Sequence, residues 1–257
     1  MAARLNDISI LPSAAKPCQI LAMLVLNDER LVTKSAVFEE LWAEKPPSSA
    51  TTTMHTYIHQ LRRCIDRALG TGSALRSRDI LVTERTGYSL RLYGGETDVC
   101  EFRRHVRQGL TAFENGDFQA ASTLLARGLS MWRGPVLSDV PLGPLLSLEA
   151  MSLEDARMAA LNRRIEADLH LGRHMEIMGE LRALATQHPL NETFAAHYMV
   201  SLYHSGRVGK ALEEFQRIRT TLVRELGIEP AARLRRLQKV ILTGGPALEH
   251  PTMVASF

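Results

Sequence analysis

A polar and basic surface is predicted on one side of a helix that spans residues 50–69. At 100° per residue, Met54, Ile58, Leu61 and Ile65 form a narrow apolar stripe that would be buried. No carboxylate occurs on this helix before Asp66, although an ordinary surface helix mixes both signs of charge. The side chains opposite the stripe and on its flanks are Thr52, His55, Thr56, His59, Gln60, Arg62 and Arg63.

These side chains carry the hydrogen-bonding groups that read or hold nucleic acid. Arginine can donate two parallel bonds to guanine, and threonine and histidine can reach base edges or phosphates. Ser48 and Ser49 precede the helix as candidate N-caps, and the N-terminal amides of a helix can hold a phosphate. The pattern therefore favours a helix that enters the major groove of DNA, and a solvated helix face is the alternative.

A predicted β-hairpin follows this helix. Two β-type runs, 80–83 and 88–92, flank a turn at 84–87. Residues 48–93 carry seven basic and three acidic residues, a net charge of +4, whereas residues 1–47 carry five basic and six acidic residues, a net of −1. The positive charge is thus concentrated on the elements that would meet a phosphate backbone. The residues placed at the hairpin tip are Thr83, Arg85, Thr86 and the turn-forming Gly87.

Shorter elements must position this helix and hairpin. A short strand is predicted at 8–11, and a helix begins near Pro17 and ends at 27–29. Thr33 is a candidate N-cap for a second helix, 34–42, and a proline break follows it. The order of helix, helix, proline break, long helix and hairpin predicts a winged helix-turn-helix domain over residues 1–95.

The second half of the chain has helical periodicity, with a repeat. Gly172 and Gly206 are 34 residues apart, which is the period of tetratricopeptide helix pairs, and Gly116 marks a third unit. A small residue is expected five positions after each glycine; Ala121 and Ala211 fit this pattern, and the second unit, with Ile177, does not. Pro189, seventeen positions after Gly172, fits the pattern as well. An insertion holding Trp132–Pro135 separates the first two units.

We therefore expect a mainly α fold. An all-α, tetratricopeptide-like repeat domain over 96–243 would follow the winged domain, with a disordered tail at 244–257. A plain helical bundle with accidental glycine spacing is the alternative to the repeat.

Composition narrows the function classes. The formal charge of +3 and pI of about 8.9 permit nucleic-acid binding without requiring it. Cys18, Cys64 and Cys100 are odd in number and widely spaced, which argues against a disulfide framework or a zinc site and favours core or half-buried thiols. The longest apolar run, 20–26, is too short to span a bilayer. We expect a cytoplasmic, nucleoid-associated protein without membrane contact.

Catalytic and metal-binding patterns are weak. No P-loop, nucleophile elbow or zinc-protease motif occurs, so we expect neither an enzyme nor a cofactor. His170 and His174 lie four residues apart near Glu166, but the expected inter-helix turn separates them, so no metal site is predicted. Trp132 beside Arg133 could form a partner contact, although a core tryptophan that locks the inserted loop is the favoured interpretation.

Several long segments resemble the Streptomyces antibiotic regulatory protein (SARP) family. In the first half these are residues 41–50, Thr53, residues 56–63, and the hairpin runs 81–83 and 87–90. In the second half the resemblance extends to that family's bacterial transcriptional activation domain. The matching segments there are 132–140, 164–174, 188–190 and 225–230.

The resemblance implies an OmpR-type winged helix with residues 50–69 as its recognition helix. It further implies binding to direct repeats in promoters of secondary-metabolite clusters, and recruitment of RNA polymerase including its sigma factor. The chain departs from the family pattern near its start, where most of the N-terminal sheet is expected to be missing. Cys18 also stands where the family usually has a basic residue.

We therefore expect a sequence-specific transcriptional activator that binds double-stranded promoter DNA. Two copies would lie side by side, head to tail, on direct repeats. A protein-interaction scaffold with a winged domain that does not bind DNA is the main alternative, and an enzyme of unrecognised type is a third. The predicted DNA contacts are Ser49, Thr52, Thr53, His55, Thr56, His59, Arg62, Arg63, Thr83, Arg85 and Thr86.

Overall fold

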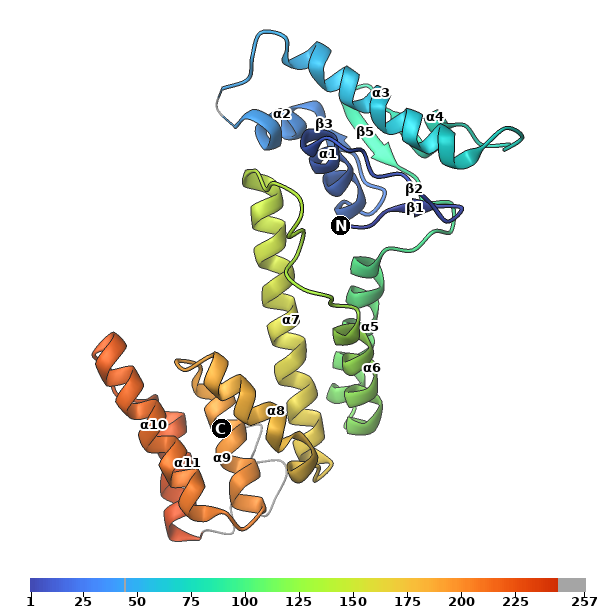
Figure 1. The fold of residues 1–257 in the computed structure, drawn as a ribbon. Coiled ribbons are helices and arrows are strands. Elements are labelled where there is room, and N and C mark those ends of the chain that lie inside the picture. The colour runs from blue at the N-terminus through green and yellow to red at the C-terminus, as the bar shows by residue number, and fades with distance from the viewer. Residues whose placement is uncertain (44, 245–257) are drawn as a thin grey trace. The chain divides into compact units, whose positions relative to one another are not determined.

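The computed structural model describes residues 1–43 and 45–244, and the chain forms two compact units (Figure 1). The N-terminal unit comprises Met1–Arg103 and Met131–Arg157. The helical unit comprises Arg104–Ser130 and the described residues from Met158 onward. The mainly α fold class is confirmed. The predicted tail, residues 244–257, lies outside the described residues except for Gly244.

The N-terminal unit contains short strands and helices in the predicted order. Helices α2 and α3 have the predicted bounds, whereas the strand predicted over residues 8–11 is shorter, and β1 and the one-turn helix α4 were not predicted. The elements are β1 (Arg4–Leu5), β2 (Ile8–Ser9), α1 (Ala15–Leu26), β3 (Val32–Thr33), α2 (Lys34–Trp42), α3 (Ala50–Leu69), α4 (Ser77–Ile80), β4 (Leu81–Thr83) and β5 (Gly87–Leu90).

The remaining helices are joined by short turns, apart from the predicted inserted loop. Helices α5 and α7 each contribute residues to both units. The elements are α5 (Asp98–Glu114), α6 (Phe118–Ser130), α7 (Pro144–His170), α8 (His174–Gln187), α9 (Glu192–His204), α10 (Val208–Leu226) and α11 (Ala232–Thr243).

The hairpin belongs to a three-stranded antiparallel sheet of order β3–β5–β4. Thr83 pairs with Tyr88 across the hairpin, and Thr33 pairs with Gly87. Gly87 closes the predicted hairpin turn, since the Glu84 N–H donates to its carbonyl at 2.9 Å, but it is also the first residue of β5, where a side chain would collide with the Val32 carbonyl of β3. The glycine is needed for the close approach of β3.

Helix α1 lies in the centre of the N-terminal unit. Five consecutive residues, Ile20–Leu24, are at most 3% exposed, so neighbours must cover this helix on nearly all sides. The apolar stripe of α3 packs in the same core, which Leu146 and Leu153 of α7 complete. Residues from both segments of the unit therefore share one hydrophobic core.

A buried carboxylate joins α2 to the start of α7. Glu40 is 3% exposed and accepts hydrogen bonds from the backbone N–H groups of Gly143 (2.6 Å), Leu145 (2.9 Å) and Leu146 (3.0 Å). The N–H groups at the start of a helix have no partners within the helix, so Glu40 supplies their acceptor. The dipole of α7 also favours a negative charge at this end. A side chain at position 143 would collide with Glu40, so glycine is required there.

The helical unit contains the predicted turns. Gly116, Gly172 and Gly206 have φ of 78°, 74° and 73° and lie between α5 and α6, α7 and α8, and α9 and α10. Ala121 and Ala211 are fully buried after the first and third turns. The three helix pairs therefore share the same left-handed glycine conformation in the turn. In the second pair, Ile177 stands at the position that a small residue occupies in the other two.

An ion network also lies within the helical unit. The buried Asp168 accepts hydrogen bonds from Ser122 of α6 (2.7 Å), Arg164 (3.2 Å) and Arg173 (3.0 Å). Arg164 also pairs with Glu180 of α8. Because the charges are paired and hydrogen-bonded, burial of Asp168 is tolerated, and the network connects the first helix pair to the second.

His197 of α9 is 2% exposed, and neither of its ring nitrogens has a hydrogen-bond partner. Burial and the nearby Arg233 of α11 lower the pKa of His197 to about 4. Glu166 of α7 lies 3.9 Å away, and burial raises the pKa of that carboxyl despite Arg163 and Arg233. The core is therefore built around a neutral imidazole.

Glu40→Ala should lower the free energy of unfolding of the N-terminal unit by about 2–3 kcal/mol, because three buried N–H groups lose a charged acceptor. Urea unfolding followed by tryptophan fluorescence measures this, since both tryptophans, Trp42 and Trp132, lie in that unit. Glu39→Ala, on the same helix but exposed, is the matched control and should stay within ~0.5 kcal/mol of wild type. Equal effects of the two variants would contradict a capping role.

The helical unit should lose stability as the pH falls below 6.5. The unfolded chain then binds a proton at His197 that the folded chain excludes, at a cost on the order of 2 kcal/mol between pH 7 and pH 5. The raised pKa of Glu166 acts in the opposite direction, so the comparison with His197→Leu isolates the histidine. Hydrogen exchange of the α9 amides provides the measurement.

His197→Leu should flatten this pH dependence, and His55→Leu, an exposed histidine of the other unit, should leave it unchanged. An equally steep profile in His197→Leu would show that another group is responsible.

Candidate nucleic-acid interface

Helix α3 presents the predicted face to solvent. Met54, Ile58, Leu61 and Ile65 are at most 3% exposed, which confirms the buried stripe. Of the predicted contacts near and on this helix, Thr53 and Arg62 are half-buried. The exposed ones are Ser49, Thr52, His55, Thr56, His59 and Arg63.

The N-terminus of α3 differs from the prediction in one respect. Ser49 occupies the N-cap position, as predicted, but its side chain makes no capping hydrogen bond. The Ser49 carbonyl accepts the first hydrogen bond of the helix, from the Thr53 N–H at 2.9 Å. The first turn of α3 carries no acidic residue, and this leaves its positive end open to an anion.

Thr56 has part of its hydrogen-bonding capacity in use. Its hydroxyl donates to the Thr52 carbonyl one turn earlier at 3.1 Å. The hydroxyl can still accept a bond, and the methyl group can contact apolar base edges such as the thymine methyl.

The tip of the β4–β5 hairpin carries the three predicted wing residues. Thr83, Arg85 and Thr86 are all exposed, and the Thr86 carbonyl accepts a hydrogen bond from the Lys34 N–H at 2.9 Å. The hairpin is therefore held from α2 as well as from the sheet. Helix α3 and the hairpin lie beside one another in the N-terminal unit (Figure 1), and a side chain of α3, Arg62, bonds the Leu81 carbonyl of the hairpin.

Arg62 does not extend into solvent. Its Nη2 donates to the Leu81 carbonyl (2.7 Å) and to the Thr83 hydroxyl (2.7 Å), and its Nε donates to the same Leu81 carbonyl (3.3 Å). Burial and the neighbouring Arg78 lower the pKa of Arg62 from its usual value. Two of the predicted DNA contacts, Arg62 of α3 and Thr83 of the hairpin, are therefore hydrogen-bonded to each other.

Arg67 lies one helical turn beyond Arg63 and is exposed. It is not among the DNA contacts predicted from the sequence, although the spacing of four residues places it near Arg63 on the helix surface.

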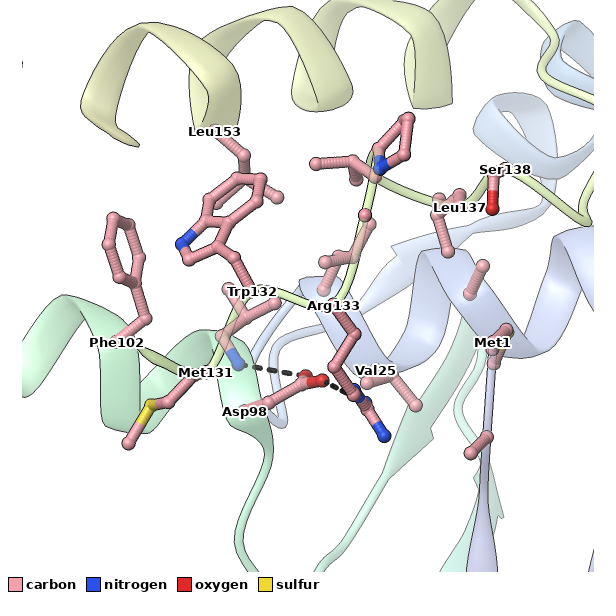
Figure 2. A pocket seen from close by; sticks show the side chains of 17 residues that line it. Met1, Val25, Asp98, Phe102, Met131, Trp132, Arg133, Leu137, Ser138 and Leu153 are labelled. Atoms are coloured by element: carbon pink, nitrogen blue, oxygen red, sulfur yellow. Dashed lines mark hydrogen bonds and ion pairs between the residues drawn. The ribbon is translucent and has the colours of Figure 1, made fainter. Parts of the chain in front are cut away.

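The inserted loop carries Trp132 and Arg133, the other residues singled out in the sequence. The Trp132 ring meets Phe102 edge to face at 5.4 Å, and Arg157 lies over it at 4.8 Å. Arg133 pairs with Asp98 at 3.0 Å, and these residues line a cavity of about 410 Å³ (Figure 2). Trp132 is half-buried against the core, which is the geometry of a side chain that locks the loop.

The histidines, cysteines and acidic residues do not form a metal site in the described part of the chain. No group of three or more of these side chains there is arranged to hold a metal ion. His170 stacks on Phe118 at 4.1 Å, and His174 stacks on His204 at 4.3 Å, so the two histidines have different partners.

The three cysteines are free and half-buried, as predicted. Within the described part of the chain, no helix has the length and apolar character needed to cross a bilayer.

Two family models match separate parts of the chain. The family model for the C-terminal part of transcriptional regulatory proteins matches residues 11–90. The model for the bacterial transcriptional activator domain matches residues 97–242, more than half of the chain.

Similar proteins carry the names of regulators. The chain is 42% identical over 245 residues to the regulatory protein DnrI of Streptomyces peucetius, covering 95% of this chain and 90% of that protein. It is 36% identical to the regulatory protein AfsR of Streptomyces coelicolor, covering 89% of this chain but 22% of the longer AfsR.

A solved structure has the same fold. EmbR of Mycobacterium tuberculosis, in complex with a low-affinity phosphopeptide, superimposes with a TM-score of 0.84 at 32% identity. The match covers 96% of this chain and 65% of the EmbR chain.

Arg63→Ala should weaken binding to a cognate duplex by ~1–3 kcal/mol and relax sequence preference at one position, because a guanidinium on the exposed face would lose a bidentate base contact. Fluorescence anisotropy with a set of single-base operator variants measures both effects. Arg30→Ala, which removes an exposed charge outside α3, is the control and should preserve the preference. An unchanged profile in Arg63→Ala would remove this residue from the reading surface.

Proposed function

The chain belongs to the Streptomyces antibiotic regulatory protein family of transcriptional regulators, and from this we propose that it is a sequence-specific activator that binds promoter DNA and recruits RNA polymerase. The observation that carries the proposal is the exposed face of α3. It is polar and basic, it has no carboxylate before Asp66, and it lies beside an equally exposed hairpin tip.

The α3 face and the wing have complementary roles in this proposal. Base edges would be read by the central exposed side chains of α3, while the hairpin tip and the first turn of α3 hold phosphates. The charge distribution supports this assignment, because the helix and hairpin carry +4 and the preceding residues −1. The proposed contacts are Ser49, Thr52, Thr53, His55, Thr56, His59, Arg63, Thr83, Arg85 and Thr86.

A single α3 reads only a few base pairs, so we propose two copies on adjacent sites. Direct repeats would place the copies head to tail on one face of the duplex, without a two-fold axis.

The helical unit is proposed to contact the transcription machinery. Its stacked helix pairs offer a surface that does not depend on α3. Val223, Leu226 and Ile228 near the end of α10 are 45–54% exposed, and exposed apolar side chains of this size are common at protein contacts. RNA polymerase with its sigma factor is the proposed partner, and genes of secondary-metabolite synthesis are the proposed targets.

Selection from random duplexes at two salt concentrations tests the proposal. The full chain should enrich a short motif that is repeated in one orientation, and its affinity should fall steeply with salt because neutralised phosphates release counterions. In vitro transcription from the selected site should then rise when the chain is added. No enrichment at either salt would favour a scaffold that does not bind DNA. Enrichment without higher transcription would refute activation but not DNA binding.

A further inference from the structure

Arg62 differs from the other basic residues of α3 in what its guanidinium contacts. All three of its hydrogen bonds go to β4, the first strand of the hairpin: two to the Leu81 carbonyl and one to the Thr83 hydroxyl. Arginine holds its donors in a rigid planar fork, so the two acceptors fix the direction of the guanidinium.

A second side chain of α3 holds the segment that leads into β4. Asp66, four residues after Arg62, accepts a hydrogen bond from the Ser77 N–H at 3.1 Å. Residues i and i+4 are neighbours on a helix surface, so two positions of α3 one turn apart hold β4 and the segment that leads into it. Arg62 lies on the flank of α3, between the buried stripe and the exposed face, and Asp66 lies nearer the exposed face, on the side of His59.

The position of the wing follows from these contacts. The hairpin has β5 between β3 and β4, and its tip extends beyond the sheet with Arg85 exposed. Of these strands, β4 is the one that Arg62 bonds. The angle between α3 and the hairpin tip decides whether base-reading and phosphate-holding side chains can meet one duplex together.

We propose that Arg62 is a positioning residue: its fork holds the wing at a fixed angle to α3, so that Arg63 and Arg85 contact the same duplex. This inference rests on the proposed DNA-binding function. It differs from the sequence-based expectation, in which Arg62 itself touches DNA.

A double-mutant cycle between Arg62 and Arg85 tests the proposal, with the full chain and the duplex obtained by selection. Arg85→Ala in the wild-type background should weaken binding about tenfold, because one charged hydrogen bond to phosphate is lost. In the Arg62→Ala background the wing is already misplaced, so the same change should weaken binding less than about twofold. Sequence preference at each operator position should be unchanged by Arg62→Ala.

Arg67 provides the matched control. It is an exposed arginine of the same helix, and the structure records no hydrogen bond from it to β4. A cycle between Arg67→Ala and Arg85→Ala should be additive, with Arg85→Ala costing the same factor in both backgrounds.

Arg62→Lys separates positioning from charge. Lysine keeps the positive charge but cannot hold both acceptors in one plane, so a positioning role predicts that the Lys variant behaves as Arg62→Ala does. A direct phosphate contact predicts near wild-type affinity instead. Thr83→Val removes one acceptor and leaves the Leu81 carbonyl in place, so it should reduce the Arg85 effect only partly. Thermal unfolding of each variant identifies any that fail to fold.

Additive effects of Arg62 and Arg85, or loss of preference at one base in Arg62→Ala, would overturn the positioning role while leaving DNA binding intact. A wild-type chain that enriches no duplex would overturn the proposed function and this inference together. The outcomes are therefore distinguishable.

Discussion

The N-terminal unit depends on one buried carboxylate. Glu40 leaves solvent almost completely, and a desolvated charge is tolerated only where donors surround it. The three N–H groups at the start of α7 provide those donors, and α7 in turn needs an acceptor for them. Each group satisfies the other, and Gly143 is the residue that allows the two main chains to approach.

This contact explains why the compact unit does not end where the DNA-binding family model ends. That model matches residues 11–90, yet Met131–Arg157 packs into the same unit. Helix α1 provides the reason, because five consecutive residues are buried and a small sheet with α3 covers only part of its circumference. Leu146 and Leu153 of α7, with Trp132 from the inserted loop, contribute to the remaining cover.

The exposed face of α3 follows from the same packing. One stripe of the helix is buried in this core, Arg62 bonds β4 and Asp66 bonds the Ser77 N–H at the start of α4, and the exposed remainder is polar and basic. In the proposed function, the polar residues of α3 and the hairpin thus divide into those available to a duplex and those that hold the helix and hairpin in place. The positive charge of an arginine on α3 does not by itself show whether its side chain is available to a duplex or holds the hairpin.

The sequence alone determined the helices and their faces, because these depend on local spacing. The stripe from Met54 to Ile65, the bounds of α2 and α3 and the glycine turns at 116, 172 and 206 were all predictable from periodicity and turn preference. Long motifs identified the family. Only the tertiary structure showed that Glu40 caps α7, that Gly87 pairs with β3 and that Arg62 bonds β4. Those contacts join residues 19 to 106 positions apart, and no local pattern records which distant carbonyl or N–H group a side chain will meet.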